Sequence, residues 1–213
     1  MLIDNYTIVL SRYNEDISWC DGFKNILVYN KGRPFIAKHN IRYITNIGHE
    51  SHTYLTYILE HYYKLPDVVC FFQAIPHIDN FIGRPISGAE TEIVEKFVNL
   101  KSFSSGNYEN KPFNFGLSPD FRIGAYPIGQ PLVLHDTDGY TFFKECINSE
   151  VNIYNLNIYF GGNFSVKREA ILSRPIEYYF YLWSKFRATH CELGHFFERS
   201  WYYIFNLHKF NEN

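Results

Sequence analysis

The stretch IGHESHTYLTYILEHYYKLPDVVCFF, residues 47–72, decides the fold because it places a helix directly before a buried strand. Apolar residues within 54–59 recur at the spacing of one helical face, and Pro66 ends that pattern. The continuous apolar run at 68–72 is typical of a strand that is covered on both faces of a sheet. A helix followed by such a strand predicts an α/β fold.

The preceding residues repeat this alternation. Apolar runs at 7–10 and 26–29 predict strands, a weaker strand is expected at 41–46, and a short helix is expected at 16–23. Strands that alternate with helices predict a mostly parallel, doubly wound sheet. Ligands of such sheets bind beyond the carboxyl ends of the strands, so we expect the functional residues there.

The second half of the chain is less regular. We expect a helix over 90–100, a long surface loop over 104–120, a strand at 131–135 and a further strand within 152–166. The segment at 140–147 fits a helix or an extended piece. Two final helices are expected at 170–187 and 192–205. We interpret residues 1–213 as one domain, because this length suits a single core.

Composition excludes several classes of protein. A formal net charge of −2 and a pI near 6.5 make nucleic acid an unexpected partner. No run reaches the roughly 20 apolar residues of a membrane span, and the amino-terminal sequence does not resemble a signal peptide. The four cysteines form no CxxC pair. We therefore expect a cytoplasmic protein with no membrane span, which is compatible with being one module of a longer polypeptide.

Aromatic residues make up 19% of the chain, with 18 Tyr and 20 Phe. Aromatic rings serve mainly in core packing, but they also stack on sugars and bases. Walker A, GxGxxG, GxSxG and HExxH motifs are absent, which argues against the common ATP-binding, NAD-binding, esterase and metalloprotease classes.

Four segments carry a resemblance to a known family: VLSRYNEDISW, VYNKG, the stretch from NIGHE to FFQAIP, and FGGNFSVKREAILSRP. They resemble poorly characterised domains of fungi and algae. More closely, they resemble the amino-terminal domain of chlorella-virus GT-A type glycosyltransferases that build capsid glycans. This resemblance implies a mostly parallel mixed sheet of about six strands, a UDP-sugar donor, a Mn²⁺ or Mg²⁺ cofactor and a glycan or glycoprotein acceptor. It also implies a Rossmann-like nucleotide-binding half, 1–101, an acceptor half, 102–213, and reaction in the host cytoplasm.

The resemblance implies a metal site just beyond the strand at 68–72. GT-A enzymes usually place an Asp-x-Asp there, whereas this chain has His77-Ile78-Asp79. We predict Asp79 as the main ligand and His77 as the second, because hard divalent ions prefer carboxylate oxygens. A turn capped by Asp79 is the alternative. Asp136 and Asp138 form a literal Asp-x-Asp, but they follow the long loop and lie beyond the half in which the family places its metal. Two acidic residues before Gly139 also fit an ordinary turn.

The resemblance also suggests a set of nucleotide-sugar ligands at the strand ends and at one helix start. A guanidinium can hold phosphate, an aromatic ring can stack on a pyrimidine, and a helix start favours an anion. The predicted residues are Ser11, Arg12, Tyr13, Asn30, Lys31, His49, Glu50, Ser51, Gly161 and Gly162. Glu50 fits equally well as an ordinary acidic residue of a first helical turn, and the glycine pair fits a β-bulge.

Related inverting enzymes hold a catalytic base where this chain has Glu198, and Glu192 is a substitute. Arg199 or Lys167 would then stabilise the departing UDP. A solvated helix face is the alternative for these charges. The resulting hypothesis is a metal-dependent hexosyltransferase. A non-catalytic glycan-binding module and a metal-dependent phosphodiesterase remain alternatives.

Overall fold

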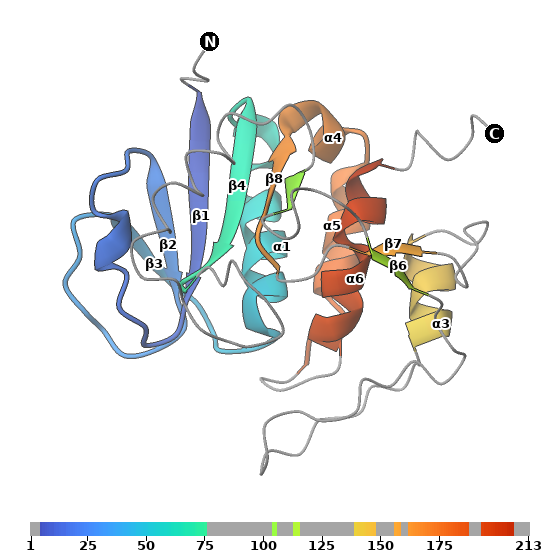
Figure 1. The fold of residues 1–213 in the computed structure, drawn as a ribbon, viewed down its shortest axis with the longest axis horizontal. Coiled ribbons are helices and arrows are strands. Elements are labelled where there is room, and N and C mark those ends of the chain that lie inside the picture. Colours follow the sequence, from blue (N-terminus) through green and yellow to red (C-terminus); the bar gives the residue numbers. More distant parts are fainter. Residues whose placement is uncertain are drawn as a thin grey trace.

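The computed structural model describes residues 5–75, 104–105, 113–115, 139–147, 156–158, 162–187 and 193–206. Its centre is a six-stranded mixed sheet in the order β3-β2-β1-β4-β8-β5 (Figure 1). The strands are β1 (Tyr6–Arg12), β2 (Ile26–Asn30), β3 (Asn40–Tyr43), β4 (Val68–Gln73), β5 (Ser104–Ser105) and β8 (Phe164–Lys167). The predicted α/β fold with a mixed sheet flanked by helices is confirmed.

The first four strands are parallel, and β8 runs antiparallel to both β4 and β5. Short 3-10 turns, η1 (Ser18–Cys20) and η2 (Tyr62–Lys64), follow β1 and α1. The expected helix at 16–23 is therefore limited to the single turn η1. A separate two-stranded sheet pairs β6 (Phe113–Phe115) with β7 (Leu156–Ile158).

One face of the sheet carries helices α1 (His49–His61), α5 (Ile176–Trp183) and α6 (Leu193–Asn206), as Figure 1 shows. The short helix α4 (Arg168–Leu172) follows β8, and α3 (Gly139–Phe142) continues into η4 (Phe143–Ile147). The expected helix at 170–187 is two helices, because Pro175 stands immediately before α5 and cannot continue α4. The helix expected at 90–100 and the strand expected at 131–135 lie outside the described residues.

Aromatic rings form the core between the sheet and the helices. Tyr54 of α1 lies 4.9 Å from Phe71 of β4 and 5.7 Å from Phe164 of β8, measured between ring centroids. Trp201 of α6 lies 5.2 Å from Phe164, and all four residues are buried. Such ring pairs add roughly 0.5–1.5 kcal/mol beyond the area that they bury. These four aromatic residues therefore serve in core packing.

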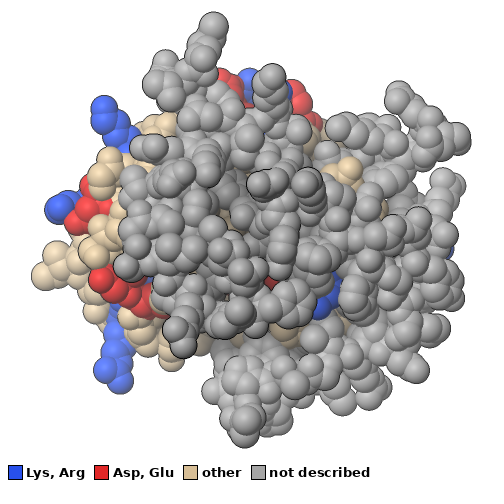
Figure 2. Space-filling model, in the orientation of Figure 1, with Lys and Arg blue, Asp and Glu red and all other residues tan. Residues whose placement is uncertain are grey.

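None of the helices in the described ranges is both long and apolar enough to cross a membrane. Figure 2 shows acidic and basic side chains interspersed along the side that carries η1, β2 and β3. This part of the described surface has no continuous basic patch of the kind that nucleic acid requires.

Candidate functional site

The carboxyl ends of β1, β2 and β4 meet the start of α1, the start of β8 and the first turns of α6. Parallel strands end at one edge of a sheet, and β8 begins there because it runs antiparallel to β4 (Figure 1). Gly48 permits the abrupt start of α1, because its φ of 60° is left-handed and a β-carbon there would lie 2.3 Å from the Phe186 ring. This edge is where the doubly wound topology places ligands.

Glu50 lies at the centre of this edge. A β-carbon on Gly162 would come within 3.1 Å of the Glu50 Oε1 atom and 3.3 Å of the Gln73 Nε2 atom. Gly162 also has a left-handed φ of 62°, and its carbonyl accepts a hydrogen bond of 2.9 Å from the Tyr54 hydroxyl. The Gln73 N–H donates to the Asn163 side-chain oxygen at 2.9 Å. The turn before β8 is thereby fixed against the end of β4, beside the Glu50 carboxyl.

Glu198 approaches the same place from α6. Burial raises the pKa of Glu50, and the charge of Glu198 raises it further, whereas the Glu50 backbone N–H, Lys31 and Gln73 lower it. The Glu198 Oε2 atom lies 3.4 Å from the Arg199 NH1 atom and 3.9 Å from the His195 Nδ1 atom. Arg199 is itself buried, and burial lowers its pKa. Two carboxyl groups from distant parts of the sequence therefore share one partly buried, polar site.

Lys31 holds the turn that leads into α1. Its buried ammonium group donates to the carbonyl of Ile47 at 2.6 Å and also to the carbonyl of His49. His49 adopts a left-handed φ of 48°, and a β-carbon on Gly194 of α6 would lie 3.4 Å from the His49 ring. The structure thus gives Lys31 a positioning role for the residues around Glu50.

Arg12 and Asn30 are also engaged within the protein. The buried Arg12 side chain donates to the Asn30 side-chain oxygen and to the Glu15 carbonyl, each at 2.8 Å, and its guanidinium lies 3.6 Å from the centre of the Phe35 ring. The Asn30 amide nitrogen donates to the carbonyls of Gly32 and Arg33. These two residues shape the ends of β1 and β2.

Three other predicted ligands have different surroundings. The Tyr13 side chain is half-exposed at the end of β1. Ser11 is turned toward α1, with its hydroxyl 2.9 Å from the Thr53 hydroxyl. Ser51 is fully buried, and its hydroxyl oxygen has no hydrogen-bond partner among the described residues.

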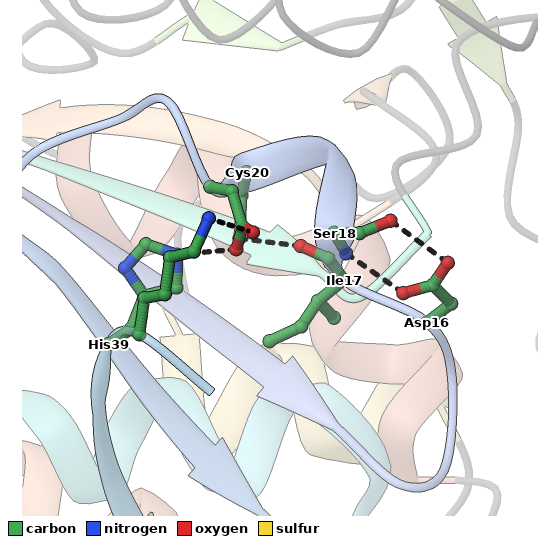
Figure 3. Close-up of polar contacts among 7 residues, drawn as sticks. Asp16, Ile17, Ser18, Cys20 and His39 are labelled. Atoms are coloured by element: carbon green, nitrogen blue, oxygen red, sulfur yellow. Dashed lines mark hydrogen bonds and ion pairs between the residues drawn. The ribbon is translucent and has the colours of Figure 1, made fainter. Parts of the chain in front are cut away.

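A pocket of about 470 Å³ opens between the loops that follow β1 and β2. Its walls include Arg12, Phe35 and three carboxylates, Glu15, Asp16 and Asp21. Figure 3 shows the Asp16 carboxylate accepting hydrogen bonds of 2.9 Å from the Ser18 N–H and the Ser18 hydroxyl, which hold the pKa of Asp16 below its usual value. Lys38 also lines the pocket, with its ammonium 2.8 Å from the Asp21 carboxylate. Carboxylates accept hydrogen bonds, so Glu15 and Asp16 can bind hydroxyl groups such as those of a ribose.

Several predicted residues lie outside the described parts of the chain: His77, Asp79, Gly161, Asp136, Asp138 and Glu192. The strand β8 starts beside Glu50, so its last residue, Lys167, lies at the opposite edge of the sheet from Glu198. Lys167 is exposed there, away from the place where UDP would depart. The described residues include no group of three or more His, Cys, Asp or Glu side chains that could hold a metal ion.

Sequence reasoning missed Gln73, Asn163 and His195 as members of this site. Gln73 had a visible signal, because it is the first polar residue after the apolar run at 68–72. Asn163 and His195 had none, because their place depends on how β8 and α6 pack against the strand ends.

The chain is similar to the family described as "Protein of unknown function (DUF3431)", whose model matches residues 8–110. The matched part includes the parallel strands together with Lys31, Glu50 and Gln73, but neither Gly162 nor Glu198. No curated protein and no solved structure matches the chain.

Proposed function

We propose that this protein is a metal-dependent glycosyltransferase of GT-A type that moves a hexose or deoxyhexose from a UDP-sugar to a glycan acceptor. The observation that carries the proposal is the convergence of Glu50 and Glu198 at the carboxyl edge of a parallel sheet, the same edge at which the loops after β1 and β2 form a pocket with carboxylate walls. The family resemblance of the sequence suggests the UDP-sugar, and it also suggests a capsid glycan as acceptor.

Glu198 is proposed as the base. Its carboxylate lies at the same edge as Glu50, 3.4 Å from the Arg199 side chain, which can hold it in position. In the transfer, the acceptor hydroxyl oxygen forms a bond to the anomeric carbon while the bond from that carbon to the UDP oxygen breaks. The hydroxyl proton goes to Glu198, and UDP leaves with the bonding electrons.

Glu50 is proposed to bind the donor sugar. Its raised pKa lets the carboxyl group keep a proton at higher pH than usual, so that it can donate a hydrogen bond to a sugar oxygen. Gly162 leaves open the space beside that carboxyl, because any β-carbon there would crowd it. Lys31 keeps Glu50 in place through the carbonyls before it.

Asp79, with His77, is proposed to hold Mn²⁺ or Mg²⁺ after β4. Such an ion neutralises charge on the departing diphosphate when it is bound. The carboxylates Glu15 and Asp16 would bind the ribose hydroxyls, and the exposed Tyr13 ring is available to stack on the uracil.

The experiment compares Glu198→Gln with wild type and with the control Glu169→Gln, whose carboxylate is exposed on α4. UDP release is followed with a panel of UDP-sugars and oligosaccharide acceptors in the presence of Mn²⁺. Loss of a general base should lower kcat roughly 10²- to 10⁴-fold, while UDP affinity and the circular dichroism spectrum stay unchanged. Wild-type turnover by Glu198→Gln would remove Glu198 from the mechanism.

A further inference from the structure

A second pocket, of about 640 Å³, lies at the opposite edge of the sheet from the candidate site. It is formed where β1, β2 and β3 begin, against the last turn of α1 and η2. Its volume falls within the roughly 300–1,000 Å³ that is typical of ligand sites. Of the residues proposed for sugar transfer, those that the structure describes do not line it.

Three asparagines form a row along this pocket. Asn5 and Asn25 stand immediately before β1 and β2, and Asn40 is the first residue of β3. These strands are neighbours in the sheet, but Ile8 pairs with Ile26 and Leu27 pairs with Asn40, so each asparagine is offset by two residues along the strands from the next. The row therefore runs diagonally over about 16 Å. The backbones are fixed, because the Asn25 carbonyl accepts a hydrogen bond from the Ile8 N–H at 2.9 Å and the Asn5 carbonyl accepts one from the Asp67 N–H at 3.0 Å.

The carboxamides of this row are exposed, and among the described residues they have no hydrogen-bond partner. Each carboxamide has two N–H donors and one acceptor oxygen in a plane. A rigid row of such groups can pair with a series of hydroxyl groups, each of which both donates and accepts.

The His61 ring, which is partly exposed, faces the pocket from α1, and the Tyr57 ring beneath it is buried. The His61 ring stacks on the Tyr57 ring with centroids 4.4 Å apart and an angle of 18° between the planes. The His61 Nδ1 atom also lies 3.1 Å from the Tyr57 carbonyl oxygen, which fixes the ring. The pocket therefore joins one ordered, partly exposed ring, that of His61, to a row of amides, and a sugar, with apolar C–H faces and hydroxyl edges, matches both.

Charge argues against an anionic ligand. Among the described residues, no carboxylate lines the pocket, and Lys64 is the one Lys or Arg residue there. Phosphate chains and nucleic acids bind through several cations, which this pocket does not offer. We propose that the pocket binds a neutral oligosaccharide and thus forms a glycan site separate from the transfer site.

The test uses two-dimensional ¹⁵N NMR spectra of the full chain, without UDP-sugar or metal. The probes are neutral hexasaccharides of glucose, mannose and N-acetylglucosamine, with inorganic phosphate as the charged probe. At least one hexasaccharide should shift the side-chain NH₂ signals of Asn5, Asn25 and Asn40.

The matched variant is Asn25→Gly combined with Asn40→Ala. Asn25 has a left-handed φ of 58°, which glycine adopts readily, and Asn40 is exposed on the edge strand, so both changes remove amides with little effect on folding. The Kd for the hexasaccharide should rise at least fivefold, whereas the control Thr45→Ala, exposed beyond the other end of β3, should leave it unchanged.

Three results would overturn the proposal: no hexasaccharide shifts these signals, phosphate shifts them while no hexasaccharide does, or the double variant binds as tightly as wild type. Because donor binding and turnover are measured at the other edge, failure here leaves the transfer proposal standing, and failure of transfer leaves this one standing.

Discussion

Replacing Gly162 with alanine tests whether the turn before β8 shapes the space beside Glu50. The left-handed φ of 62° costs an L-residue about 1–2 kcal/mol. The new methyl group would also lie 3.1 Å from the Glu50 Oε1 atom and 3.3 Å from the Gln73 Nε2 atom. Both atoms end flexible side chains and can move, so we expect the free energy of unfolding to fall by about 1–2 kcal/mol, mainly from the backbone.

The matched control is Gly22→Ala. A β-carbon on Gly22 would meet no atom within 4 Å, and its φ is not left-handed. Urea denaturation should show Gly162→Ala less stable by the stated amount and Gly22→Ala within about 0.5 kcal/mol of wild type. Calorimetry should show weaker UDP-sugar binding by Gly162→Ala, because Glu50 is displaced. If Gly162→Ala keeps both wild-type stability and wild-type affinity, the geometry assigned to this turn is wrong.

Two pH-dependent predictions concern buried groups near the start of α1. Burial raises the pKa of Glu50 above 4.5, so the native state keeps the carboxyl proton to a higher pH than the unfolded chain does and loses stability as the pH rises above 4.5. Glu50→Gln, which cannot ionise, should therefore be more stable than wild type at neutral pH and equally stable below pH 4.5. The pKa of His52, which packs between Trp183 and Phe186, is lowered from 6.5 to about 4, mainly by burial. Acidification from 6.5 to about 4 should therefore cost about 3 kcal/mol in wild type and much less in His52→Leu. Urea titrations across this pH range measure both effects, and parallel pH profiles of variant and wild type would contradict either prediction.

The parallel half of the sheet could be predicted from the sequence because its burial has a direct signature. The run at 68–72 is apolar throughout, and β4 is buried along almost its whole length. The positions of Glu50 and Glu198 along their helices were also predictable from local pattern. Their convergence was not, because it depends on how α6 packs against the start of α1, where Gly194 meets His49.

The predicted roles of Arg12 and Lys31 show what the sequence could not reveal about the site. At the strand ends Arg12 suggests a phosphate ligand and Lys31 a base or ribose ligand, but both side chains are buried and bonded to groups of the protein. Sequence alone does not reveal that nearby carbonyls and the Phe35 ring already surround these cations. The predicted metal ligands His77 and Asp79 stay predictions, because they lie outside the described residues.

Calorimetric titration of the protein with UDP, in the presence and absence of Mn²⁺, tests the proposed transfer site most directly. We predict that UDP binds when Mn²⁺ is present and only weakly without it, and that Asp79→Ala weakens this binding more than Asp138→Ala does. Absence of UDP binding under both conditions, or equal binding with and without Mn²⁺, would contradict the proposed function.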